Sequence, residues 1–150
     1  MDAQGAELVE RTGAGIERLR ASLAVLSEGD LRRTVHGGWT VAAVVAHLAF
    51  WDGWVETRWR MFAQAGSFDD LPDTIADLVN SAAEPVWLAV PGGAARDLAL
   101  AAADRVHGAI RGLDARAVAA AISTNRPAML DRTRHWDAHV AEIRQSLASS

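Results

Sequence analysis

The sequence predicts an all-α protein, a four-helix bundle with additional short helices. Apolar residues recur at three- and four-residue spacing through four long stretches, which is the period of a helix with one buried face. No segment alternates apolar and polar residues for long, as a half-buried strand would. A length of 150 residues predicts a single domain over 1–150 that is large enough for a sizeable core, and half of the residues are apolar.

The first two long helices are expected over about 5–27 and 40–65. Glu28-Gly29-Asp30 ends the first, whose inward residues are Val9, Ile16, Leu19, Leu23 and Leu26. A loop then leads to Thr40, a good N-cap, with Trp39 before it as an apolar staple. Gly66-Ser67 ends the second helix, whose inward residues are Val41, Val44, Leu48, Trp51, Val55 and Phe62.

The second half of the chain predicts one shorter helix and two more long ones. The shorter helix is capped by Asp73 and bent or ended by Pro85, with Ile75, Leu78, Val79, Ala82 and Val86 inward. Pro91-Gly92-Gly93 breaks the chain before a long helix over about 95–112, with Leu98, Ala102, Val106 and Ile110 inward. A short helix over 116–122 precedes the last one, expected from about 127 to 148, with Met129, Trp136, Val140, Ile143 and Leu147 inward.

The composition excludes several classes of function. A net charge of −4 provides no basic face, so we expect no nucleic-acid partner. No apolar run reaches the roughly 20 residues that span a bilayer, and the polar N-terminus is unlike a signal peptide. We therefore expect a cytoplasmic protein with no membrane partner. Because the chain has no cysteine, nitrogen and oxygen atoms must hold any metal ion.

Three histidines indicate a metal site. His135 and His139 are four residues apart, which puts both on one face of the last predicted helix. They and His47, in the second predicted helix, each directly precede an inward apolar residue, so all three should lie at the margin of the core. Such a trio can hold one divalent ion and leave one side open. The simpler interpretation, an exposed or hydrogen-bonded helix histidine, suits His36 and His107 better.

Four segments together are typical of a known family. Gly38-Trp39-Thr40-Val41 opens the second predicted helix, and Ala46-His47-Leu48-Ala49-Phe50-Trp51-Asp52 lies within it. Leu78-Val79-Asn80 follows in the middle, and 135–143 contains the late histidine pair. In these segments and in helix order the chain resembles the DinB-like superfamily, which includes YfiT-type metal-dependent hydrolases, bacillithiol S-transferases and mycothiol-dependent maleylpyruvate isomerases.

The resemblance implies a metal ion and a small substrate. It implies a four-helix bundle with a three-histidine site for zinc, nickel or another divalent ion, with His47, His135 and His139 as ligands. It favours a low-molecular-weight thiol such as mycothiol as a second cofactor, which would have to come from outside a chain without cysteine.

Two reaction classes suit such a site, and the residues alone do not choose between them. A thiol can lose its proton at the metal and attack an electrophile, as in an S-transferase or isomerase, which the resemblance favours. Alternatively, a water of pKa about 7 can be activated for hydrolysis. A third interpretation is a non-catalytic metal-binding stress protein.

Two residues shortly before the histidine pair are candidates for supporting roles. Asp131 and Arg132 are four and three residues before His135, which puts them on its face of the predicted helix. Asp131 can accept a hydrogen bond from the His135 ring, and Arg132 can bind a carboxylate of a substrate or cofactor. The simpler alternative for both is a surface contact within the helix.

Further candidates come from the middle of the chain. Trp51 follows His47 by one helical turn and can wall a substrate pocket, although helix aromatics are more often core residues. Asn80 matches a family position and can reach the pocket or bond a helix end. Asp52 is expected to point elsewhere, as a surface or capping carboxylate.

An apolar surplus on the helices makes a homodimer an open alternative.

Overall fold

The computed structural model describes residues 3–69, 71–72 and 74–149. Helices make up 78% of it, and the strands form only a two-stranded hairpin, so the predicted all-α class is confirmed. The elements are α1 (Ala3–Ala24), α2 (Glu28–Leu31), β1 (Thr34–His36), β2 (Trp39–Thr40), α3 (Val41–Ala65), α4 (Ile75–Leu88), α5 (Gly92–Arg111), α6 (Ala115–Ser123), the 3₁₀ turn η1 (Pro127–Met129) and α7 (Thr133–Ala148).

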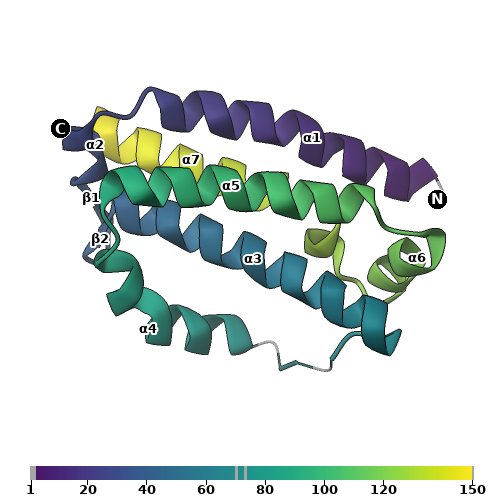
Figure 1. The fold of residues 1–150 in the computed structure, drawn as a ribbon. Coiled ribbons are helices and arrows are strands. Elements are labelled where there is room, and N and C mark those ends of the chain that lie inside the picture. The colour runs from purple at the N-terminus through teal and green to yellow at the C-terminus, as the bar shows by residue number, and fades with distance from the viewer. Residues whose placement is uncertain (1–2, 70, 73, 150) are drawn as a thin grey trace.

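The four long helices α1, α3, α5 and α7 form a bundle (Figure 1). Helix α5 packs against α1 and α3, and α7 packs against the same two helices. Following the colours of Figure 1, α3 and α5 run in the same direction, whereas α7 runs opposite to both. A parallel pair needs a connection that crosses the length of the bundle, and α4 makes that crossing outside α3.

The core lies between these helices and contains most of the predicted inward residues. Buried examples from all four long helices are Leu19, Leu23, Val44, Leu48, Val106, Ile110, Trp136 and Ile143. Thr40 caps α3 as expected, because its hydroxyl accepts a hydrogen bond from the Ala43 N–H at 3.1 Å. Among the described residues, no helix combines the length and the apolar character needed to cross a membrane.

The predicted inward face is wrong for α4 and in part for α5. Leu78 and Val86 are 67% and 65% exposed, whereas Trp87 is buried. The helix also continues through Pro85 to Leu88 instead of ending there. In α5, Leu98 is 52% exposed and Ala99 is buried in its place. Most of the buried side chains of α5 are alanines, which apolar periodicity does not single out, whereas α4 buries Trp87, one position beyond the predicted inward residue Val86. Asp73, the expected cap of α4, lies outside the described residues.

A hairpin lies just before α3, where the sequence predicts a loop. Its strands β1 and β2 pair antiparallel, with His36 opposite Trp39. Gly37 and Gly38 form the turn with φ of 50° and 87°, the left-handed region that glycine enters without steric cost. The hairpin thereby places the rings of His36 and Trp39 side by side at a centroid distance of 5.7 Å.

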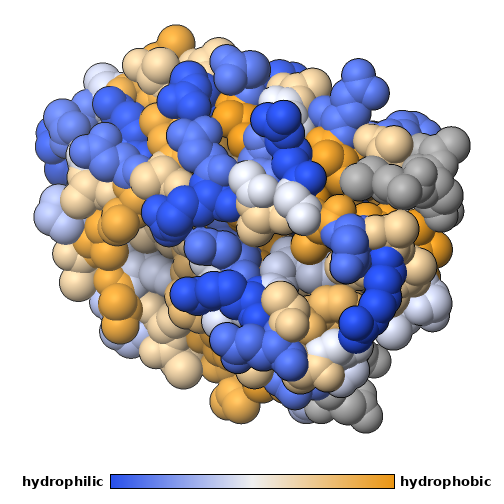
Figure 2. Space-filling view, turned by 45° about the vertical axis from the view of Figure 1, so that its right-hand side comes forward, coloured by the Kyte–Doolittle hydropathy of each residue, from blue (hydrophilic) through white to orange (hydrophobic). Residues whose placement is uncertain are grey.

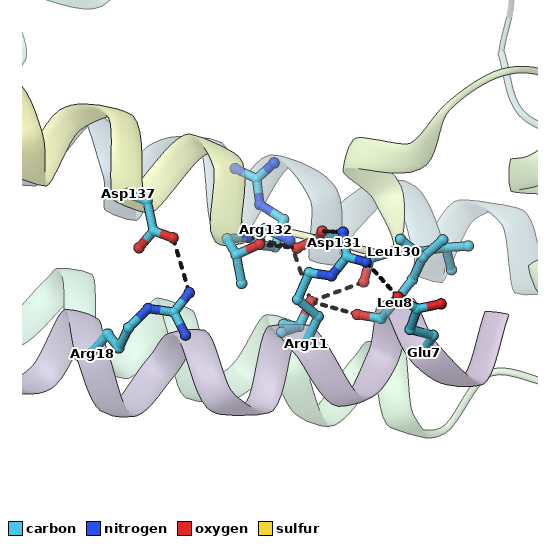
Figure 3. Close-up of polar contacts among 10 residues, drawn as sticks. Glu7, Leu8, Arg11, Arg18, Leu130, Asp131, Arg132 and Asp137 are labelled. Atoms are coloured by element: carbon cyan, nitrogen blue, oxygen red, sulfur yellow. Dashed lines mark hydrogen bonds and ion pairs between the residues drawn. The ribbon is translucent and has the colours of Figure 1, made fainter. Parts of the chain in front are cut away.

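The last helix begins later than predicted. After η1 the chain turns, and α7 starts at Thr133 instead of near Pro127. The Asp131 carboxylate accepts hydrogen bonds from the Thr133 backbone N–H at 2.8 Å and from the Thr133 hydroxyl, which supports this later start. Arg11 of α1 donates to the same carboxylate at 3.4 Å (Figure 3). Asp131 and Arg132 therefore lie in the turn before the helix that was expected to carry them.

Candidate metal centre

The fold brings together three histidines that are up to 92 positions apart in the chain. His47 lies in α3, and His135 and His139 lie one turn apart on α7. One ring nitrogen from each can be chosen so that all lie within 4.8 Å of one another. The Nε2 atoms of His47 and His135 are 3.2 Å apart. Three nitrogens at this spacing suit one divalent ion bound between α3 and α7.

Burial keeps two of these rings neutral. It lowers the pKa of His47 to about 3, and the charges of neighbouring groups such as Arg132 act in the same direction. Burial likewise lowers the pKa of His135 to about 2, with Arg132 as the next largest cause. Both imidazoles are therefore uncharged at pH 7, which is the form that binds a metal ion.

Glu142 orients the third ring. The Nδ1–H of His139 donates to the Glu142 carboxylate at 2.8 Å, which leaves Nε2 free. The same carboxylate lies 3.7 Å from His36 Nε2, at the tip of the hairpin. Glu142 is not among the residues predicted for the site, although its position three residues after His139 on one helix is a signal for this contact.

Asp131 does not make the contact that its sequence position suggested. Its carboxylate bonds Thr133 and Arg11, because residue 131 precedes the helix and faces α1 (Figure 3). Arg132 occupies the place expected for an acceptor, with Nη2 at 2.9 Å from the Nδ1 of His135. The prediction that Asp131 accepts a hydrogen bond from the His135 ring is therefore wrong. The ring instead contacts Arg132, which can only donate.

The prediction that Asp52 is a surface or capping carboxylate is also wrong, because the residue is 0% exposed. One carboxylate oxygen accepts from Arg132 Nε at 2.8 Å, and the other accepts from Trp136 Nε1 at 2.8 Å. Burial raises the pKa of the Asp52 carboxyl, whereas the charge of Arg132 and the two hydrogen bonds act against this shift. A pairing between residues 80 positions apart leaves no local signal in the sequence.

A cavity of about 550 Å³ opens onto the histidines. Trp51 and Asn80 line it together, because the Trp51 indole N–H donates to the Asn80 side-chain oxygen at 3.0 Å. Trp39 also lines the cavity, with its ring 5.3 Å from that of His47, so its place is at the site and not only at the helix start. Buried Trp87 lies 4.8 Å from the same histidine ring. This volume suits a small molecule.

A family model described as the mycothiol maleylpyruvate isomerase N-terminal domain matches residues 12–144 of the chain. The chain belongs to this family. The family is part of the DinB-like superfamily, so the resemblance inferred from the sequence is confirmed. No curated protein and no solved structure matches the chain.

The donor set fits the metal ion that this DinB-like family implies. Three imidazoles without a thiolate are ligands that zinc and nickel accept. The Nε2 of His47 faces the Nε2 of His135 at 3.2 Å, so these are the nitrogens placed to share an ion. Of the three rings, only that of His139 has an acceptor at its Nδ1, because His47 Nδ1 is buried without a partner and His135 Nδ1 faces the donor Arg132.

Proposed function

We propose that this protein is a metal-dependent enzyme that uses a low-molecular-weight thiol such as mycothiol, as an isomerase or S-transferase for a small molecule. The observation that carries the proposal is the convergence of His47, His135 and His139 on a cavity of small-molecule size. The family, which takes its name from a mycothiol-dependent isomerase, supports the choice of thiol chemistry.

The proposed ligands are the three histidines, with zinc or nickel as the ion. A divalent ion held there would supply positive charge that favours the thiolate form of a bound thiol. The chain contributes no cysteine, so the reacting sulfur must belong to the cofactor. The nucleophile would therefore be part of a molecule that enters the cavity.

The residues around the proposed metal site would bind and orient the thiol and its electrophilic partner. Glu142 fixes the ring of His139 through its Nδ1–H. The hydrogen-bonded pair of Trp51 and Asn80 forms an amphipathic wall of the cavity, with an apolar ring face and a polar amide. Trp39 covers the ring of His47 and helps to keep water from it. These residues would define where a thiol and its electrophilic partner can lie.

Calorimetry with mycothiol tests this proposal on the zinc-loaded protein. We expect binding to the zinc-loaded wild type and none to the metal-free protein or to zinc-treated His139→Ala. A matched control is His107→Ala, because His107 lies between α1 and α5, away from the site. Zinc-dependent ester cleavage without any thiol would instead favour a hydrolase. Zinc binding with neither activity would favour a metal-binding protein without turnover.

A further inference from the structure

A second cavity, of about 200 Å³, lies between α1 and α7 at the end of the bundle where α2 is found (Figure 1). Its apolar wall includes Leu23 of α1, Leu26 of the following turn, and Val140 and Ile143 of α7, each less than a tenth exposed. It shares no lining residue with the cavity over the three histidines. A molecule bound here would therefore leave the metal centre unobstructed.

The side chains between α1 and α7 explain why this space is open. Ahead of the cavity the two helices are in close contact, because a Cβ added at Gly15 would overlap Thr133 and lie 3.2 Å from the ring of Trp136. Further along, neither α1 nor the part of α7 after Trp136 contains a Phe, Tyr or Trp. Only aliphatic side chains are available to fill the interface there, and they leave the cavity between them.

The rim of the cavity carries an arginine without an acidic partner. Arg144 lines the cavity, and its Nη2 donates to the Ser22 hydroxyl at 2.9 Å. Among the described residues, no carboxylate lies within ion-pair distance of this guanidinium. Asp30 also lines the cavity, but its carboxylate accepts hydrogen bonds from the N–H and the hydroxyl of Ser27 at 2.8 and 2.7 Å. The rim thus offers a cation whose side-chain contact is neutral.

We propose that this cavity is a second small-molecule site, which binds a short apolar chain that ends in an anionic group. An apolar cavity of about 150 Å³ admits benzene, so about 200 Å³ holds a chain of about six carbon atoms. The chain would lie against Leu23, Val140 and Ile143, and the anionic group would lie at Arg144, whose guanidinium is matched to it in charge. Hexanoate has both features and is the probe for the tests.

The first test locates hexanoate by the methyl NMR signals of the protein. We expect hexanoate to shift the methyl signals of Leu23, Val140 and Ile143, with a Kd on the order of 1 mM. The shifts should be the same in the zinc-loaded and the metal-free protein, because the cavity contains no histidine. Shifts that require zinc would assign hexanoate to the metal centre and overturn the proposal, as would unshifted signals at about ten times that concentration.

The second test removes the charge and keeps the apolar wall. Arg144→Gln should bind hexanoate about two- to fivefold more weakly than the wild type, the range for an ion pair at an exposed arginine. It should bind hexan-1-ol, which has no charge, as the wild type does. Arg134→Gln removes another exposed arginine of α7 and should leave hexanoate binding unchanged. Equal hexanoate affinity in Arg144→Gln and the wild type would overturn the proposal.

The third test fills the cavity. Ser22→Phe adds a ring at the half-buried residue that Arg144 contacts, and we expect it to weaken hexanoate binding at least about tenfold. Ser81→Phe makes the same change at an exposed position of α4 and should bind like the wild type. Wild-type affinity in Ser22→Phe would contradict the site. Methyl shifts that follow protein concentration without hexanoate would instead identify a second copy of the chain as the occupant and overturn the proposal.

Discussion

At the scale of single residues, the site consists of buried polar groups whose charge states the fold has fixed. His47 and His135 have lowered pKa values of about 3 and about 2, because burial disfavours their charged forms. Asp52 and Arg132 are buried as a pair. Each arrangement has a consequence for stability or metal affinity that can be measured separately.

The buried histidines make the metal-free protein sensitive to acid. Between pH 6.5 and pH 3 the unfolded chain binds protons at these rings and the folded chain does not, so stability falls as the pH falls. At pH 5 the loss is about 2 kcal/mol for each histidine. Urea unfolding at pH 7 and pH 5 measures it. His47→Gln should show a smaller difference between the two pH values, and an unchanged difference would contradict the assignment.

Removing Asp52 should strongly destabilise the protein. Asp52→Ala leaves the guanidinium of Arg132 buried without its partner, at a cost of about 3–5 kcal/mol. Asp137→Ala removes a carboxylate from the exposed pair with Arg18 (Figure 3) and should cost less than about 1 kcal/mol. Urea denaturation of both variants gives the comparison. Similar losses in the two would show that the Asp52 pair is not a buried anchor.

Removing Glu142 should weaken the metal site without unfolding the protein. Glu142→Ala leaves the Nδ1–H of His139 without its acceptor, so we expect about 10–100-fold weaker zinc binding. Competition with a chelator measures the affinity. Gln145→Ala, an exposed neighbour on α7, is the control and should bind zinc like the wild type. Wild-type affinity in Glu142→Ala would count against this role.

At the scale of elements, local signals predicted some helices well and others poorly. The Thr40 cap and the glycine at the end of α3 are contacts within a few residues, and both are where the sequence placed them. The inward face of α4 depends on long-range packing against α3, and the turn before α7 depends on contacts of Asp131 with α1. The approach of the three histidines follows from helix register, whereas the pairing of Asp52 with Arg132 does not.

The corrected face of α4 has a direct test. Leu78 is exposed, so Leu78→Ala should change the unfolding free energy by no more than about 0.5 kcal/mol. Leu23→Ala makes the same chemical change at a buried position of α1 and should cost about 2–5 kcal/mol. Urea midpoints compare the two variants. A large loss from Leu78→Ala would restore the face that the sequence predicted.

At the scale of the whole molecule, the crossover through α4 allows α3 and α7 to lie side by side and to share the site. Trp39 of the hairpin and Asn80 of α4 line the edges of the cavity at this site.

On the face shown in Figure 2, hydrophilic side chains interrupt the hydrophobic ones. The homodimer and the single-domain organisation stay predictions.

The most direct test of the central claim is elemental analysis of the purified protein after zinc loading and desalting. We expect about one equivalent of zinc in the wild type and in His107→Ala, and a loss of most of it in His135→Ala. Zinc absent from the wild type, or retained in full by His135→Ala, would contradict a metal centre built from His47, His135 and His139.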